Sequence, residues 1–199
     1  IDPWGDIGAG QYKANMSQAL DSQIAYEIFR HNAVLSARKR NISVSEMRAT
    51  SRAALPLLGG GRFHLIYIDG GHSYDDARFD ITECHRLLAA GGIMCGDDLE
   101  LQAHQCDMEF LAASKGADYI TDAEDRGLHP GVTLAVHEFF GTVSVFDGFW
   151  AMRKCSGGGY EPVDFQGATG ILPGHWPEEF QAQARACVTE SQSLGVLMA

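Results

Sequence analysis

Acidic residues stand at three places where strands are predicted to end, and these carboxylates could do chemistry together. Asp2 follows an apolar first residue, Asp69 follows the apolar run 63–68, and the pair Asp97-Asp98 follows the short apolar run 93–95. Ligands of open α/β sheets bind beyond the carboxyl ends of the strands, so we expect these carboxylates along one edge. Carboxylates gathered there repel one another unless a cation lies between them. Since Mg²⁺ takes oxygen ligands, the pattern favours a divalent cation held by two or three of these side chains.

The first acidic position also has an interpretation that involves a cofactor. In nucleotide-binding α/β folds, an acidic residue at the end of the second strand accepts hydrogen bonds from ribose hydroxyls. Asp2 suits that role, and Trp4 is close enough in sequence to pack against the same cofactor. The structural alternative is that the aspartates form turns and helix caps and that Trp4 packs in the protein. Both interpretations stay open from the residues alone.

Strands and helices must alternate to position these side chains, and the apolar pattern predicts that they do. The run 63–68 suits a central parallel strand covered on both faces, and a helix is expected from Ser51 to the glycines at 59–61. The arms 142–146 and 149–153 indicate a hairpin at an antiparallel edge. Further strands are predicted at 42–47 and 93–95, and further helices at 17–36, 74–88, 106–115, 130–140 and 180–191. This alternation implies an α/β fold with a mostly parallel sheet and helices on both faces.

Composition bounds the class of protein. The chain has 199 residues, of which 45% are hydrophobic, and this is enough for one domain, 1–199, with a core at 1–153 and an extension at 154–199. The net charge of -11 argues against a nucleic-acid partner and favours a small-molecule substrate. We expect no membrane span, because no run of 18 apolar residues occurs, and a cytoplasmic location. A homo-oligomer stays open.

Cysteine usage and the first residues add two further expectations. The five cysteines are odd in number and form no CxxC pair, so we expect reduced thiols and no disulfide framework. The opening Ile1-Asp2-Pro3-Trp4 is typical of the end of a strand. We therefore expect a first strand and a glycine-rich loop upstream of the sequence.

Several of these motifs together resemble a known family. The stretch 63–74, FHLIYIDGGHSY, is followed by LLAAGGI at 87–93 and then by Asp97-Asp98. This order resembles the class I S-adenosylmethionine-dependent methyltransferases, and within them the branch of macrocin-type and other sugar or antibiotic O-methyltransferases. The resemblance covers about 1–153. It implies a Rossmann-like methyltransferase fold, S-adenosylmethionine as cofactor and a hydroxylated small molecule, such as a sugar or glycosylated natural product, as substrate.

The resemblance also implies roles for individual residues. Asp2 matches the acidic residue that holds the cofactor ribose, and Ser51 matches a position near the adenine, which Thr50 could contact through its hydroxyl. The metal of the metal-dependent members, Mg²⁺ or another divalent cation, is bound by three carboxylates. These match Asp69, Asp97 and Asp98, and Asp69 also borders the cofactor.

A general base is less clearly marked. Some metal-dependent members carry an acidic residue at the position of Gly71, and this sequence does not. His72 is the first candidate, because an unperturbed histidine titrates near neutral pH, and its alternative role is to order the loop. His129 and His104 are the second and third candidates. Three functions are therefore weighed: a metal-dependent O-methyltransferase, a metal-independent methyltransferase of the same fold, and a degenerate module that only binds.

Overall fold

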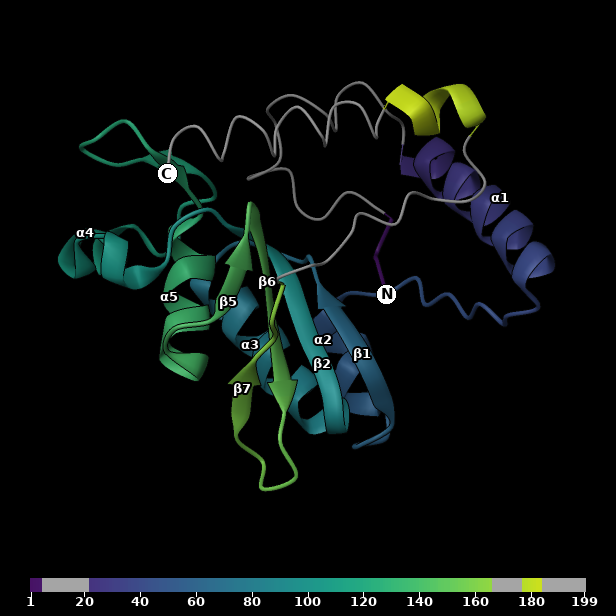
Figure 1. Ribbon diagram of the computed structural model, residues 1–199, viewed down its shortest axis with the longest axis horizontal. Coiled ribbons are helices and arrows are strands. Elements are labelled where there is room, and N and C mark those ends of the chain that lie inside the picture. Colours follow the sequence, from purple (N-terminus) through teal and green to yellow (C-terminus); the bar gives the residue numbers. More distant parts are fainter. Residues whose placement is uncertain (5–21, 166–176, 184–199) are drawn as a thin grey trace. The chain divides into compact units, whose positions relative to one another are not determined.

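The computed structural model describes residues 1–4, 22–165 and 177–183. The chain divides into two compact units, residues 1–163 and residues 164–199. In the second unit residues 178–183 are helical, and the rest of the helix predicted at 180–191 lies outside the described residues. The four described cysteines, Cys84, Cys95, Cys106 and Cys155, are free thiols, as expected. All elements labelled below belong to the first unit (Figure 1).

The first helix overlaps its predicted range, but the strand predicted after it is wrong. Helix α1 spans Ser22–Arg40, and its predicted start at 17–21 lies outside the described residues. Residues 42–47 form no strand, although the Asp2 backbone N–H donates a hydrogen bond to the Met47 carbonyl oxygen at 3.2 Å. A strand needs a series of such bonds to a neighbouring strand, and alternation in the sequence does not supply that neighbour.

The short helix after this segment forms as predicted. Helix α2 spans Ser51–Ala54 and continues into the 3-10 turn η1, Leu55–Leu57. Thr50 is its N-cap, with Oγ1 accepting a hydrogen bond from the Ala53 backbone N–H at 3.3 Å. A threonine cap satisfies one of the N–H groups that a helix start leaves unpaired, so this local sequence is enough to begin a helix.

The core of the fold is a parallel strand pair joined by a helix. Strand β1 spans Phe63–Ile68, α3 spans Tyr74–Leu87, and β2 spans Leu88–Leu99. β1 and β2 pair in parallel, with Ile68 opposite Gly96. We predict from the sequence that 63–68 is a central strand covered on both faces. Among the described strands, however, β1 lies at the edge of the sheet, and most of its residues are exposed.

The remaining strands of this sheet run antiparallel. β5, Ser144–Phe146, and β6, Gly148–Lys154, form the predicted hairpin, and β7, Tyr160–Pro162, pairs with β6. The hairpin turns at Asp147-Gly148, where both residues have positive φ, 49° and 83°. Such two-residue turns match the twist of antiparallel strands. β6 also pairs with β2, again antiparallel. Only one of the four described pairings in this sheet, that of β1 with β2, is parallel.

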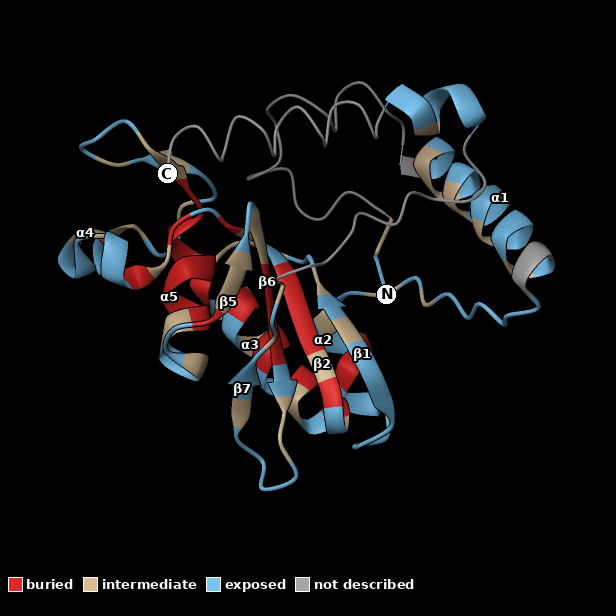
Figure 2. Cartoon of the chain, viewed as in Figure 1, coloured by how far each residue is buried: buried red, intermediate tan, exposed pale blue. Residues whose placement is uncertain are grey.

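Two helices cover one face of the sheet. Helix α5, Pro130–Phe140, forms over its predicted range and packs beside α3 on the face to which Met94, Trp150 and Met152 point. Figure 2 shows the buried residues concentrated between these helices and the sheet. The opposite face of β1 exposes Leu65 and Tyr67. The mixed α/β class with a terminal hairpin is confirmed, while the described helices that pack on this sheet cover one face of it.

A small subdomain joins β2 to α5. It contains η2, Ala103–Gln105, then α4, Met108–Ser114, within the helix predicted at 106–115. A two-stranded sheet follows, β3 at Ile120–Thr121 and β4 at Gly127–Leu128. Leu111 and Leu128 are fully buried in a separate apolar cluster. This segment places the residues before α5 next to the ends of β1 and β2.

Candidate active site at the carboxyl ends of β1 and β2

The parallel pairing brings two of the predicted metal ligands to neighbouring positions. Ile68 lies opposite Gly96, and each is followed at once by an aspartate, Asp69 and Asp97. The hydroxyl oxygen of Tyr67 lies 3.5 Å from Asp69 Oδ2 and 3.2 Å from Asp97 Oδ2. The two carboxylates therefore face a common point, as their places at strand ends predicted.

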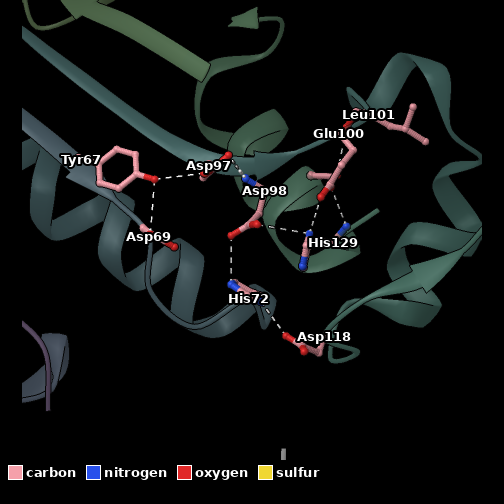
Figure 3. Close-up of polar contacts among 10 residues, drawn as sticks. Tyr67, Asp69, His72, Asp97, Asp98, Glu100, Leu101, Asp118 and His129 are labelled. Atoms are coloured by element: carbon pink, nitrogen blue, oxygen red, sulfur yellow. Dashed lines mark hydrogen bonds and ion pairs between the residues drawn. The ribbon is translucent and has the colours of Figure 1, made fainter. Parts of the chain in front are cut away.

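A β-bulge turns the third predicted ligand, Asp98, in another direction. Between Gly96 and Leu99 the pairing of β2 with β6 slips, so that three steps on β2 face two on β6. Asp98 lies in this bulge with φ at 63°, a left-handed conformation that Asp and Asn tolerate better than most residues. Bulges beside functional sites commonly redirect a side chain. Here the Asp98 carboxylate points to the two histidines shown in Figure 3.

The loop that carries His72 is fixed by a glycine on another helix. A Cβ atom on Gly131, in the first turn of α5, would lie 2.3 Å from the carbonyl oxygen of His72 and 2.4 Å from the backbone nitrogen of Tyr74. Only glycine permits so close an approach of loop and helix. At the end of the loop, Ser73 caps α3 by accepting a hydrogen bond from the Asp76 backbone N–H. His72 is thus held against the start of α5.

Carboxylates contact both ring nitrogens of His72. Nε2 lies 3.1 Å from Asp98 Oδ2, and Nδ1 lies 2.7 Å from Asp118 Oδ1. The contact with Asp98, aided by that with Asp118 and opposed by burial, raises the pKa of His72 to about 9. In this arrangement the ring is an imidazolium at neutral pH, with both N–H groups donating to carboxylates. A role for His72 as a base requires that Nε2 first be released from Asp98.

His129 is the N-cap of α5 and is 9% exposed. Its Nδ1 lies 2.9 Å from Glu100 Oε1 and 3.8 Å from Asp98 Oδ1. Its backbone N–H donates to the other oxygen of Glu100, at 3.2 Å. The rings of His72 and His129 meet edge to face, with centroids 4.5 Å apart. Asp98 thus lies between two histidines that come from different loops.

The pKa shifts in the cluster indicate an excess of negative charge around Asp69, next to the end of β1. Burial, followed by the charges of Asp98 and Asp97, raises the pKa of the Asp69 carboxyl. The hydrogen bond with His72 lowers the pKa of Asp98. Burial and then the two neighbouring aspartates raise the pKa of the Tyr67 hydroxyl. The charged form of Asp69 is therefore disfavoured in this cluster, and a cation beside it would be favourable.

The structure brings the predicted ligands together only in part. One group of atoms within 4.8 Å of one another comes from Asp69, His72 and Asp98. Asp97 is directed to Tyr67 and is not in this group. Two further groups consist of Asp98, Glu100 and His129, and of His72, Asp118 and His129. Glu100 and Asp118 were missed from the sequence, and His104 is exposed on η2 without a place in these groups.

The residues predicted to bind a cofactor are dispersed around the start of the chain and of α2. Asp2 Oδ1 accepts a hydrogen bond from the Trp4 backbone N–H at 2.7 Å. Trp4 packs on the rings of Tyr26 and Phe29 of α1, which is the packing alternative considered for it. Thr50 caps α2. These contacts leave the cofactor roles of Asp2, Trp4 and Thr50 as predictions.

Ser51 and Asp69 line a cavity of about 410 Å³ beside β1, the edge strand among the described strands of the sheet. Its walls are mainly apolar, and its most buried polar side chain is Asp80, which is 6% exposed and accepts a hydrogen bond from the Ser51 hydroxyl at 3.2 Å. Small-molecule sites commonly have this size, apolar lining and few polar groups. Asp69 belongs to both the cavity and the cluster around His72, so the two features adjoin.

One comparison with known proteins finds a family model that resembles the first part of the chain. Residues 1–99 match a family model described as a methyltransferase domain. The match spans β1, α3 and β2 with Asp69, His72, Asp97 and Asp98, and it supports a family of S-adenosylmethionine-dependent methyltransferases and a Rossmann-like methyltransferase fold. No curated protein and no solved structure matches the chain. None of the helices in the described residues is long and apolar enough to cross a membrane.

Proposed function

We propose, from the premise of a domain that uses S-adenosylmethionine, that the protein is a divalent-metal-dependent O-methyltransferase. The acceptor is a hydroxyl of a small molecule such as a sugar or a glycosylated natural product. One observation carries the proposal: Asp69, His72 and Asp98 present ligand atoms within 4.8 Å of one another at the ends of two parallel strands. Two of these atoms are carboxylate oxygens for a metal, the third is the histidine nitrogen proposed to accept the proton, and Asp69 also lines the adjoining cavity.

The cavity along β1 suits the cofactor. Its apolar walls offer surface to an adenine ring, and Ser51, which also lines the cavity, offers a hydroxyl for hydrogen bonding. Asp69 lies where the cavity meets the acidic cluster. A ligand that fills the cavity therefore reaches the carboxylates, which is the arrangement that methyl transfer to a substrate bound at those carboxylates requires. Alignment of the reacting atoms can by itself contribute on the order of 7–11 kcal/mol.

The donor set on β1 and β2 suits a hard divalent cation. Asp69, Asp97 and Asp98 offer carboxylate oxygens, the ligands that Mg²⁺ prefers. The raised pKa of Asp69 supports this fit, because it reflects burial and repulsion from two neighbouring carboxylates. When bound, such a cation supplies a template for neighbouring substrate oxygens and lowers the pKa of a substrate hydroxyl.

His72 is the residue that accepts the proton, at Nε2. Asp118 holds Nδ1 at 2.7 Å and so fixes the orientation of the ring, as the aspartate of a hydrolytic triad does for its histidine. Asp98 occupies Nε2 in this structure. Recruitment of Asp98 as a metal ligand would free Nε2 and lower the pKa of the ring towards neutrality. General bases of this kind contribute about 10²- to 10⁴-fold.

A thermal-shift experiment tests the cofactor and the metal separately. S-Adenosylhomocysteine at about 100 times its dissociation constant is expected to add roughly 2.7 kcal/mol of stability. Mg²⁺ is expected to add a further shift, which Asp98→Asn abolishes while the shift with S-adenosylhomocysteine is kept. No shift with S-adenosylhomocysteine would contradict the methyltransferase proposal and favour a binding module.

A metal-independent methyltransferase is the second candidate, because the cluster satisfies itself without a cation. His72 pairs with Asp98 and Asp118, and the Tyr67 hydroxyl lies between the remaining two aspartates. Activity towards a hydroxylated acceptor separates the two candidates. Full activity in the presence of a chelator would establish the metal-independent reaction, and activity restored only by added Mg²⁺ would establish the metal-dependent one.

A further inference from the structure

A group of one nitrogen and two oxygen ligands lies on the α5 side of the cluster, away from Tyr67. We propose that Asp98, Glu100 and His129 form a second divalent-cation site, which takes a nitrogen-preferring transition metal such as Zn²⁺. It shares only Asp98 with the three aspartates assigned above to Mg²⁺. Figure 3 shows the Glu100 and Asp98 carboxylates directed at the same ring nitrogen of His129.

The spacing of the ligand atoms suits Zn²⁺. His129 Nδ1 lies 2.9 Å from Glu100 Oε1 and 3.8 Å from Asp98 Oδ1, and all three ligand atoms lie within 4.8 Å of one another. Bonds of about 2.0–2.2 Å in a tetrahedral arrangement separate neighbouring ligand atoms by about 3.3–3.5 Å. The observed distances fall on either side of that value. Shifts of about half an ångström would bring both carboxylate oxygens to that spacing from His129 Nδ1.

The backbone holds the three side chains in place before any ion binds. His129 is the N-cap of α5, in front of a helix turn whose residues are all buried. Glu100 is fixed to it through a second hydrogen bond, from the His129 backbone N–H to Oε2. Asp98 is directed to the site by the bulge and its left-handed φ of 63°. Unusual backbone conformations of this kind are concentrated at functional sites.

Charge and ligand type select the metal. Within the described residues, the ion pairs of Asp98 and Glu100 go to His129 and His72, and none goes to a lysine or arginine. With a neutral imidazole, the two carboxylates match the charge of a divalent ion. Imidazole suits Zn²⁺, Cu²⁺ or Ni²⁺, whereas Mg²⁺ prefers an all-oxygen shell. The two sites therefore differ in the metal that they select.

Sharing of Asp98 has a regulatory consequence that rests on the proposed function. When Asp98 binds Zn²⁺ beside His129, its carboxylate is no longer available to a cation bound with Asp69 and Asp97. Zn²⁺ and Mg²⁺ are then expected to compete, and Zn²⁺ to inhibit the Mg²⁺-dependent reaction. The alternative is that Glu100 and His129 only fix the start of α5 by hydrogen bonding.

Calorimetric titration of Zn²⁺ into the metal-free full chain tests the site. One Zn²⁺ per chain is expected in the wild type. His129→Gln and Glu100→Gln each remove one metal ligand. Loss of a residue that only hydrogen-bonds to a ligand lowers metal affinity by about 10- to 100-fold, and we expect the Zn²⁺ affinity of these two variants to fall by more than that. The matched controls are His104→Gln, at an exposed histidine outside the ligand groups, and Asp125→Asn, at an exposed aspartate that has a left-handed φ as Asp98 does. Both controls are expected to bind as the wild type does.

Cobalt gives a second readout that does not depend on folding stability. Co²⁺ bound to a nitrogen ligand in the site is expected to produce visible absorption bands, which His129→Gln alters. Unchanged Zn²⁺ affinity in both His129→Gln and Glu100→Gln, or no bound Zn²⁺ in the wild type, would overturn the proposal. Equal losses in Asp125→Asn and Glu100→Gln would also overturn it, because they would indicate nonspecific binding to acidic residues.

The shift with S-adenosylhomocysteine separates this proposal from the proposed function. His129→Gln and Glu100→Gln are expected to keep that shift, which shows in addition that the variants fold. Zn²⁺ binding without any response to S-adenosylhomocysteine would leave the second site standing and remove the methyltransferase reaction. The opposite result would remove the second site alone.

Discussion

Nε2 of His72 lies 3.1 Å from Oδ2 of Asp98, so the residue that could accept a proton is paired with a residue that could bind a metal. This contact is the largest cause of the raised pKa of His72, about 9. The same carboxylate cannot both hold His72 as an imidazolium and neutralise a cation fully. Occupancy of the metal site and the protonation state of His72 are therefore coupled.

Asp98→Asn is expected to lower the pKa of His72 from about 9 towards its ordinary 6.5, because the first cause of the raised value is removed. Asparagine tolerates the left-handed backbone at this position, so the fold should be kept. A histidine NMR titration of the metal-free chain measures the change. The control is Asp125→Asn, at an aspartate with φ of 61°, which should leave the titration as it is. An unchanged His72 pKa in Asp98→Asn would contradict the pairing.

The stability of the metal-free chain is expected to depend on pH through His72. A folded-state pKa of about 9 lies above the unfolded value of 6.5, so the stabilisation is fully present below pH 6.5 and is lost as the pH rises through 9. Because the partner Asp118 is half-exposed, we expect a contribution on the order of 1–2 kcal/mol. His72→Gln removes it, so the stability difference between wild type and variant, measured by denaturant unfolding, should shrink between pH 6.5 and pH 10. A constant difference would argue against the ion pairs.

Asp80 is expected to produce a pH dependence of the same sign over a lower pH range, because its folded-state pKa is also raised. Burial raises its pKa from 3.8 to about 6, so folding is disfavoured by its charged form, and the cost develops as the pH rises from about 4 to about 6. Each pKa unit corresponds to about 1.4 kcal/mol, which sets the full cost at up to roughly 3 kcal/mol. Asp80→Asn should gain stability relative to the wild type between pH 4 and pH 7, measured by urea unfolding. A relative loss over that range would show that its bond with Ser51 outweighs the buried charge.

Gly131→Ala is expected to disrupt the site and to destabilise the protein by about 2–4 kcal/mol. Its Cβ would lie within 3 Å of three backbone atoms, from His72, Tyr74 and Lys115. Overpacking against backbone has no flexible side chain to absorb it. The matched control is Gly116→Ala, where a Cβ meets no atom within 4 Å. Chemical unfolding measures the free-energy change, and a loss in Gly131→Ala no larger than that in the control would contradict the close approach of loop and helix.

Local sequence was sufficient for most elements and for their order. The apolar run 63–68, the helix 130–140 and the hairpin arms appear over their predicted ranges or within a few residues of them. Patterns of this kind depend on neighbours within a few positions, as caps, turn residues and apolar spacing do. The positions of Asp69 and Asp97 at one edge also follow from sequence, because each aspartate comes directly after the last residue of the parallel pairing, Ile68 or Gly96.

Tertiary structure alone decided how the site is completed. The bulge that turns Asp98 away from Asp97 depends on how β2 pairs with β6, 50 residues later in the chain. Glu100 and Asp118 carry no motif, and they join the site because α5 is packed closely under the His72 loop at Gly131. Likewise, 42–47 has an alternating pattern but no partner strand among the residues that the structure describes. Pairing register, bulges and close packing are set by contacts between distant segments, and no local pattern of residues contains that information.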